Sequence, residues 1–322
     1  MSDAASDKRG GIDLGGTKIE AIVVDAENQV LGQARRPTPT EGGPADVTKQ
    51  MAETMVEAAT AAKLETASLK GVGVGSPGSV DEASGTVSQA RNLPGWGGTF
   101  ELAKTLGDTL GTPVKIGNDV QVAITAEHQL GAGRPYDSLL GVWWGTGVGG
   151  GVIIDRKLWL GRGSAGEIGH MVIKRDGALC PCGRRGCVEA YAGRAAMEIK
   201  ARKEHDEGGK TDLFKIMKHR GRVRLTSAVW AQALEEHDPL ATELIERAVE
   251  ALGAGIASAV NLLDVEAVVI GGGLGSRFGQ PMTDRIFEAS KPHLFRDDRP
   301  PEIHVAGLGD LGGATGAALL VA

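Results

Sequence analysis

The sequence predicts an α/β protein with two lobes around a central cleft. Its 322 residues are long for one compact core and sufficient for two. Near residues 15 and 147, an apolar strand, a glycine turn and a second apolar strand follow one another. This repetition predicts a duplicated architecture with one glycine turn in each lobe.

The composition is typical of a globular protein outside the membrane, with 41% hydrophobic and 24% charged residues. A formal net charge of −6 without a long basic run argues against nucleic acid as the main partner. No apolar stretch reaches membrane-spanning length, and the polar start of the chain lacks the apolar core of a signal peptide. We therefore expect a cytoplasmic protein. Its 49 glycines are clustered, which favours ligand binding through the backbone.

Strand and helix patterns alternate along the chain. In the first half we expect a strand–turn–strand segment at 11–25, a helix at 45–63, a strand at 72–75, a helix at 99–110, a strand at 114–116 and a helix at 120–130. In the second half we expect a strand–turn–strand segment at 139–154, a solvated loop or short helices at 203–223, helices at 226–236 and 240–262, a strand at 267–270, and a Gly/Ala-rich helix from about 312.

The first glycine turn has the character of a phosphate-binding loop. It reads Asp13-x-Gly15-Gly16-Thr17-Lys18. Glycine lets backbone N–H groups approach a polyphosphate closely and point toward one anion. Asp13 is a candidate to hold a water bound to Mg²⁺, because Mg²⁺ keeps several waters and takes few protein ligands. A simple β-hairpin turn is the alternative interpretation.

Two further glycine turns occur in the second half. Gly145-Thr146-Gly147 opens a run that contains G-x-G-x-x-G, but a strand and not a helix follows, which excludes a dinucleotide fingerprint. The third turn, Gly271-Gly272-Gly273-Leu274, follows an apolar strand and is a candidate adenosine platform. Its alternative is a tight connection from strand to helix.

The dipeptide Asn118-Asp119 ends a short strand and begins a helix, where side chains project beyond the edge of a sheet. Phosphoryl transfer needs positioning, charge neutralisation and a carboxylate that accepts a hydroxyl proton. Asp119 is the candidate for that base. The alternative is that Asp119 only caps the helix that follows.

A metal site is the strongest single prediction. His170, Cys180, Cys182 and Cys187 provide one imidazole and three thiolates, which is a full tetrahedral set for structural Zn²⁺. All three cysteines of the chain lie in this short segment, so a disulfide framework is not expected. The alternative is three incidental cysteines.

Two carboxylates flank the expected metal ligands. Glu167 lies three residues before His170, and Glu189 lies two residues after Cys187. Paired carboxylates on a rigid scaffold suit hydrogen bonds from vicinal hydroxyls. If zinc takes one ring nitrogen of His170, the other can donate a hydrogen bond to a substrate.

Together these motifs resemble the ROK group of sugar kinases and related repressors, within the actin/hexokinase-like superfamily. The resemblance covers nearly the whole chain from Gly11. The matching motifs are Asp13–Lys18, Asn92–Trp96, Asn118-Asp119, Gly145–Gly151, Gly166–His170, Cys180–Glu189 and Gly271–Gly275.

The resemblance implies ATP-dependent phosphorylation of a hexose, with Mg²⁺ in catalysis and Zn²⁺ in a structural role. It implies two ribonuclease-H-like lobes that close over sugar and ATP, often in a homodimer. The small lobe would be 1–117 with about 308–322, and the large lobe 118–307 would carry the zinc and adenosine sites. Asp119 corresponds to the catalytic base, and the implied sugar ligands are Asn92, Asn118, Asp119, Glu167, His170 and Glu189.

The resemblance favours glucose as the acceptor, because the 92–96 run and the Glu167, His170 and Glu189 set resemble those of glucokinases in this family. Kinases for N-acetylhexosamines, fructose, mannose and allose share most of these residues. A sugar-responsive repressor would need a helix-turn-helix domain before Asp13, and only twelve residues precede it. An assembly ATPase and a polyphosphate-dependent kinase agree less well with the cysteine segment. Trp143-Trp144 is bulkier than expected before the second turn, and core packing is the simplest explanation.

Overall fold

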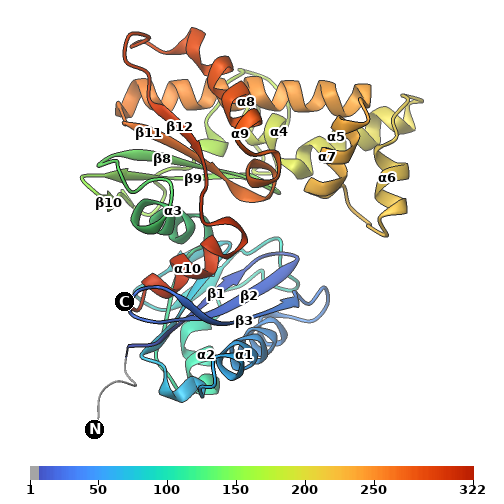
Figure 1. The fold of residues 1–322 in the computed structure, drawn as a ribbon. Coiled ribbons are helices and arrows are strands. Elements are labelled where there is room, and N and C mark those ends of the chain that lie inside the picture. Colours follow the sequence, from blue (N-terminus) through green and yellow to red (C-terminus); the bar gives the residue numbers. More distant parts are fainter. Residues whose placement is uncertain (1–6) are drawn as a thin grey trace. The chain divides into compact units, whose positions relative to one another are not determined.

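The computed structural model describes residues 7–322, which divide into two compact units (Figure 1). The first unit comprises the described chain up to Gly131 together with Leu308–Ala322, and the second comprises Ala132–Gly307. The resemblance placed residues 118–130 in the large lobe. In the structure helix α3 (Asp119–Leu130) belongs to the first unit because it packs against the C-terminal helix α10 (Gly312–Leu319).

The first unit is built on a five-stranded sheet with the order β3-β2-β1-β4-β7. Strands β1, β4 and β7 are parallel, and β2 and β3 run antiparallel beside β1. The carboxyl ends of three parallel strands therefore meet at one edge, where functional side chains commonly gather. The strands are β1 (Arg9–Leu14), β2 (Lys18–Val24), β3 (Val30–Pro37), β4 (Gly71–Ser76) and β7 (Val114–Asn118), beside a small hairpin of β5 (Ser79–Asp81) and β6 (Thr86–Ser88).

Helices cover both faces of this sheet. Helix α1 (Pro44–Ala61) and helix α2 (Leu102–Leu110) bury their apolar sides in one core cluster on one face, and α10 packs on the other. The contact with α10 is close because the sheet offers glycines there. A Cβ at Gly11 would lie 2.0 Å from the Ala314 carbonyl oxygen, and one at Gly73 would lie 1.8 Å from that of Ala317. This packing brings the start of α10 close to the end of β1.

The second unit repeats the strand order of the first. Its sheet has the order β10-β9-β8-β11-β12, with β8, β11 and β12 parallel and β9 and β10 antiparallel. The shared order is the duplication that the two glycine turns predict. The strands are β8 (Leu139–Trp144), β9 (Val148–Ile154), β10 (Lys157–Leu158), β11 (Ala267–Gly271) and β12 (Glu302–Val305).

A large helical core covers one face of the second sheet. Trp144 and Trp230 are fully buried in it, together with the apolar side of the longest helix, α8. None of the helices in the described residues combines the length and apolar content that a membrane crossing requires. The helices are α4 (Glu189–Ala192), α5 (Arg194–Asp206), α6 (Leu213–His219), α7 (Ser227–Glu235), α8 (Pro239–Leu263) and α9 (Gly272–Ser290), which is broken at Gly279 before Pro281.

Candidate functional site

The predicted site residues fall into two groups, one on each unit. The first unit carries the first glycine turn, Asn92, Asn118 and Asp119. The second unit carries the other two glycine turns, Glu167, Glu189 and the His/Cys set.

The first glycine turn joins β1 to β2 in a tight hairpin. The Gly15 N–H donates to the Lys18 carbonyl oxygen at 3.0 Å, and the Thr38 hydroxyl donates to the Gly15 carbonyl oxygen at 2.6 Å. Asn92 lies directly against this turn, because a Cβ at Gly16 would be 3.1 Å from its Nδ2. The structure thus brings an implied sugar ligand to the expected phosphate loop, although the two are 76 positions apart in the printed sequence.

Asp13 lies near the end of β1, paired in parallel register with Gly75 of β4. Its carboxylate sits against the start of α10, where a Cβ at Gly313 would be 2.7 Å from its Cγ. Burial raises the pKa of Asp13 to about 6; the Lys18 charge lowers it, and Glu20 raises it further. A carboxylate that is costly to ionise in isolation is stabilised by a bound cation, so this position suits a Mg²⁺-bound water.

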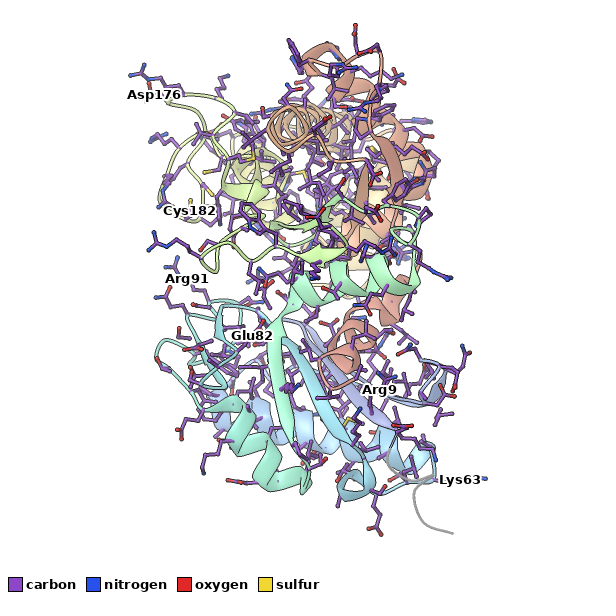
Figure 2. The ribbon with its side chains drawn as sticks, turned by 90° about the vertical axis from the view of Figure 1, so that its left-hand side faces the viewer. Arg9, Lys63, Glu82, Arg91, Asp176 and Cys182 are labelled. Atoms are coloured by element: carbon purple, nitrogen blue, oxygen red, sulfur yellow. The ribbon has the colours of Figure 1, made fainter. Side chains whose placement is uncertain are left out.

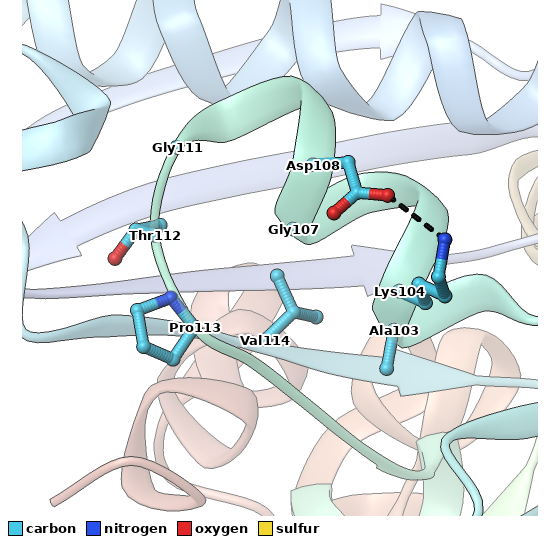
Figure 3. A pocket seen from close by; sticks show the side chains of 8 residues that line it. All are labelled: Ala103, Lys104, Gly107, Asp108, Gly111, Thr112, Pro113 and Val114. Atoms are coloured by element: carbon cyan, nitrogen blue, oxygen red, sulfur yellow. Dashed lines mark hydrogen bonds and ion pairs between the residues drawn. The ribbon is translucent and has the colours of Figure 1, made fainter.

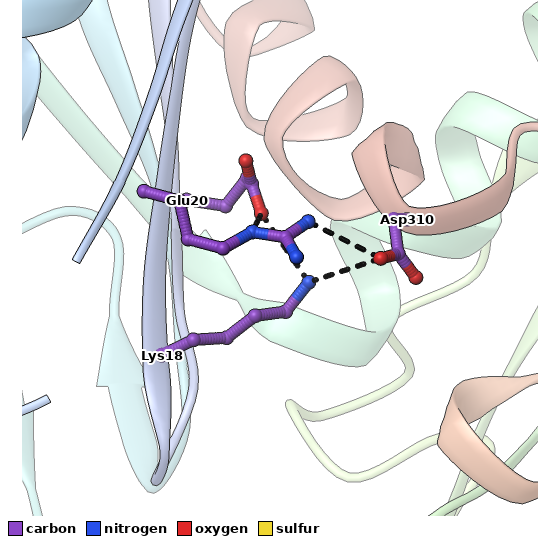
Figure 4. A network of polar contacts seen from close by, with 4 residues as sticks. Lys18, Glu20 and Asp310 are labelled. Carbon is purple, nitrogen blue, oxygen red and sulfur yellow. Dashed lines mark hydrogen bonds and ion pairs between the residues drawn. The ribbon is translucent and has the colours of Figure 1, made fainter. Parts of the chain in front are cut away.

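Lys18 is held in a network of ion pairs (Figure 4). Its Nζ lies 3.3 Å from the buried Glu20 carboxylate and 3.9 Å from Asp310. Arg35 also pairs with Glu20, and its Nη2 lies 3.2 Å from Asp310. The ammonium expected at the phosphate turn therefore already has two carboxylate partners in the first unit.

Asn118 and Asp119 form the junction between β7 and α3. The Asn118 Oδ1 accepts the Val120 and Gln121 N–H groups at 3.1 and 3.2 Å, so Asn118 is the helix cap. Asp119 is the first helical residue and its Oδ1 also accepts the Val120 N–H, at 3.0 Å. Because Asn118 provides the cap, the helix does not need Asp119 for that purpose. Asp119 also lies beside Gly75, where a Cβ would be 3.4 Å from its Cα.

In the second unit, the second and third glycine turns lie side by side. A Cβ at Gly145 would be 3.7 Å from the Gly273 nitrogen. Gly272 has φ of 81° and lies so close to the Trp144 carbonyl oxygen that a Cβ would be 2.7 Å away. Both effects require glycine at that position. Two backbone turns that the sequence separates by more than a hundred residues therefore form one surface.

The tryptophan pair before the second turn has a structural explanation. Trp144 is buried, and its Nε1–H donates to the Ala192 carbonyl oxygen at 2.7 Å. The Trp143 ring packs over Gly271, where a Cβ would be 2.8 Å from it. Core packing therefore accounts for Trp144, and Trp143 covers Gly271, the first glycine of the third turn.

The four predicted metal ligands come together. One ligand atom each from His170, Cys180, Cys182 and Cys187 lies within 4.8 Å of all the others. His170 ends a short 3₁₀ turn (Ile168–His170), and Cys182 lies on a loop labelled in Figure 2. Burial raises the pKa of the Cys180 and Cys187 thiols, which makes free thiolates costly there. One imidazole and three thiols at this spacing could hold a tetrahedral metal ion.

Glu189 connects this cluster to the second glycine turn. Its Oε2 accepts the Val148 N–H at 2.9 Å, and a Cβ at Gly147 would lie 2.3 Å from that oxygen. Its Oε1 is 3.7 Å from the Cys180 sulfur. Glu167 is more exposed, and its carboxylate lies 4.0 Å from the Nε2 of His170. Both carboxylates therefore lie at the His/Cys cluster, and Glu189 also holds the second glycine turn.

Arg194 is a candidate residue that no sequence motif indicated. It begins α5, and its Nη2 donates to the Thr146 hydroxyl at 2.7 Å. The Arg194 and Ala195 N–H groups donate to the carbonyl oxygens of Gly145 and Thr146. Only the folded chain brings this arginine to the second turn, because 48 positions separate it from Thr146.

A separate hollow of about 460 Å³ opens beside α2 and the start of β7 (Figure 3). It is lined by eight residues from 103 to 114, including the Lys104–Asp108 ion pair at 3.1 Å. None of the predicted site residues lines it, and we assign it no role.

Comparison with known proteins gives consistent matches along the chain. The model of the ROK family matches residues 9–322. A glucokinase of Thermotoga maritima is 33% identical over 291 residues, 88% of each chain. The N-acetylgalactosamine kinase AgaK of Shewanella sp. is 34% identical over 320 residues, 96% of this chain and 95% of the relative. A crystal structure of a ROK family glucokinase from Streptomyces griseus, in complex with glucose and AMPPNP, matches with a TM-score of 0.83 and 31% identity over 97% of this chain and 98% of that one.

The repeated α/β units, the paired glycine turns and the His/Cys cluster are thus found in a chain that the model of one family matches over residues 9–322. The protein belongs to the ROK family.

Proposed function

We propose that this chain, an ATP-dependent sugar kinase of the ROK family, transfers the terminal phosphate of ATP to glucose and forms glucose 6-phosphate. The observation that supports a kinase most directly is the joined surface of the second and third glycine turns, with Glu189 tying it to the His/Cys cluster. Glucose is favoured because similar proteins include the glucokinases of Thermotoga maritima and Streptomyces griseus.

In this proposal Asp119 accepts the proton of the attacking hydroxyl. Its position at the first residue of α3, beside the Asn118 cap, fixes the backbone from which the carboxylate projects. Asn92 and Asn118 provide amide hydrogen bonds to sugar hydroxyls. Because the Asn118 oxygen is used as the helix cap, its Nδ2 group is the part that can donate to the sugar.

Glu167, His170 and Glu189 hold sugar hydroxyls from the second unit in the same proposal. The Oε2 of Glu189 already accepts the Val148 N–H, so its Oε1 is the oxygen left for a hydroxyl. The His/Cys cluster is proposed to bind one structural Zn²⁺ through all four ligands, since thiolate and imidazole are donors that zinc prefers. The metal would orient His170, and by fixing Cys187 it would hold the segment that carries Glu189 two residues later.

ATP is proposed to bind through the three glycine turns: Asp13–Lys18, Gly145–Gly147 and Gly271–Leu274. Mg²⁺, when bound, neutralises phosphate charge, and Asp13 is the residue proposed to hold one of its waters. The raised pKa of Asp13 fits this role, since the carboxylate gains most from a nearby cation. A cytoplasmic homodimer, with no nucleic acid or membrane partner, is proposed from the resemblance and the net charge of −6.

A kinase for an N-acetylhexosamine is the second candidate, because a protein 34% identical to this chain is an N-acetylgalactosamine kinase. A coupled ADP-release assay with ATP and Mg²⁺ separates the two, using glucose, mannose, fructose, allose, three N-acetylhexosamines and a blank without sugar. The proposal predicts the highest kcat/KM for glucose. A higher value for an N-acetylhexosamine would replace the acceptor, and no sugar-dependent release at all would overturn the kinase assignment.

A further inference from the structure

The second glycine turn contains no charged side chain of its own. The run from Gly145 to Gly151 consists of glycine, threonine and valine, whereas the first turn ends in Lys18. A turn that binds phosphate by backbone N–H groups alone leaves most of the anionic charge uncompensated. The only side-chain cation that hydrogen-bonds to this turn within residues 7–322 comes from elsewhere in the chain: Arg194 of α5.

The contacts of Arg194 leave its charge without an anionic partner. Its Nη2 donates to the Thr146 hydroxyl at 2.7 Å and its Nη1 to the Leu225 carbonyl oxygen at 2.9 Å, both neutral acceptors. Across the described chain, no carboxylate lies within ion-pair distance of its guanidinium. Glu198, one turn along the helix, is instead used by Arg202 and by the Leu225 N–H.

The surroundings of Arg194 make its unpaired positive charge unfavourable unless an anion binds. The side chain is half-buried, and burial lowers the pKa of its guanidinium. The negative charge of Glu198 raises this pKa, and the positive charge of Arg224 lowers it. Arg224 also has no ion pair in the part of the chain that the structure describes. A half-buried guanidinium that holds the turn through Thr146 and has no carboxylate within ion-pair distance in the described chain indicates a site for an anion.

We propose that Arg194 binds a phosphate group of the nucleotide at the second glycine turn. Two of its five N–H groups hold the turn, through Thr146, and the end of the 220–225 loop, through Leu225. The other three remain as donors for phosphate oxygens, in the fork geometry that arginine offers and lysine does not. This inference rests on the proposed ATP-dependent function and adds to it a residue that contacts the donor substrate.

The test compares nucleotide binding by the full-length protein and its Arg194→Met variant. Calorimetry with ADP, ATP and adenosine, in the presence of Mg²⁺, separates phosphate contacts from base and ribose contacts. Loss of charge-assisted hydrogen bonds predicts that ADP and ATP affinities fall about 10- to 100-fold while adenosine affinity is unchanged. Arg220→Met, at an exposed arginine that hydrogen-bonds Gln232 in the same unit, is the matched control and should bind all three as wild type does.

Two further variants keep the outcome decisive. Arg194→Lys retains the charge and should show a smaller loss, so it provides the comparison if the methionine variant does not fold. Thr146→Val removes the hydroxyl that Arg194 holds. If Arg194 only positioned that hydroxyl, Arg194→Met would weaken ADP binding no further in a Thr146→Val background, and the proposal would be overturned.

Equal losses for ADP and adenosine, or wild-type ADP affinity in Arg194→Met, would also overturn it. The assignment of glucose as the acceptor can be refuted independently of the Arg194 proposal. A wild-type protein that binds ADP but does not phosphorylate glucose would refute glucose as the substrate, and the Arg194 comparison would still decide this proposal. A wild-type protein that binds neither ADP nor ATP would refute both.

Discussion

The packing of Gly313 against Asp13 leads to a prediction that separates activity from stability. A Cβ on Gly313 would lie 2.7 Å from the Asp13 Cγ and 2.8 and 3.1 Å from its two carboxylate oxygens. Ordinary contacts begin near 3.4 Å, so Gly313→Ala must displace the carboxylate by roughly 0.7 Å. The helix itself should tolerate the change, because alanine is favoured over glycine in helices by up to about 1 kcal/mol.

The magnitude follows from the role proposed for Asp13. A misplacement of about 1 Å in a binding constellation can cost roughly 100-fold in rate, so a displacement of this size should cost about 10-fold in kcat/KM for ATP. The KM for glucose should stay unchanged. The assay is ADP release at varied Mg²⁺–ATP with saturating sugar, together with thermal unfolding of both proteins.

Gly312→Ala is the matched control for this prediction. It lies next to Gly313 in the same helix, but its Cβ would meet only Leu308 Cβ at 3.3 Å and the Glu127 carboxylate at 3.9 Å. It should therefore keep wild-type kinetics for ATP. If Gly313→Ala were as active as Gly312→Ala at equal stability, the placement of Asp13 in the ATP site would be wrong.

Two other predictions concern the metal cluster and the charge of Asp13. Cys182→Ser should reduce the zinc content measured by mass spectrometry and raise the KM for glucose about 10-fold, because the proposed zinc ion would orient His170 and hold the segment that carries Glu189; a wild-type protein purified without zinc would contradict this. Because the folded-state pKa of Asp13 is raised from 3.8 to about 6, ionisation of Asp13 destabilises the fold as pH rises through this window, and the cost is complete above it. In urea unfolding without Mg²⁺ or ATP, Asp13→Asn should therefore be more stable than wild type at pH 7.5 by up to about 3 kcal/mol and equal to it at about pH 3, below the unfolded pKa of 3.8. Equal stability at both pH values would show that ionising this carboxylate does not destabilise the fold.

Much of the fold could be predicted because the central elements carry strong patterns. The helices expected at 45–63 and 240–262 correspond to α1 and α8. The first and second glycine turns each join two antiparallel strands, as expected. The stretch 203–223 contains the end of α5 and the short α6, as one of its two interpretations predicted. The edge strands β3 and β12 were missed. Each pairs on one side only; β3 contains Gly32 and the charged pair Arg35-Arg36, which are poor strand signals, and β12 has only 4 residues, too few for its alternation of polar and apolar residues to stand out.

The candidate site was predictable where one short segment supplies the chemistry. The spacing of the cysteines with His170 predicts the cluster that the structure assembles. Features that depend on tertiary contacts were not visible. The sequence does not indicate that Gly313 lies against Asp13, that Glu189 fixes the second turn through Val148, or that Arg194 reaches Thr146. Each of these contacts joins segments at least 40 positions apart, which no local pattern encodes.

The role of Asp119 as the base in glucose phosphorylation is tested most directly by the Asp119→Asn variant, with turnover and glucose binding measured on the same preparation. Removal of a general base predicts that kcat falls by at least about 100-fold, while the glucose dissociation constant changes little because the isosteric amide still fits. Turnover near the wild-type rate would show that another group accepts the proton and would contradict the mechanism proposed for this kinase.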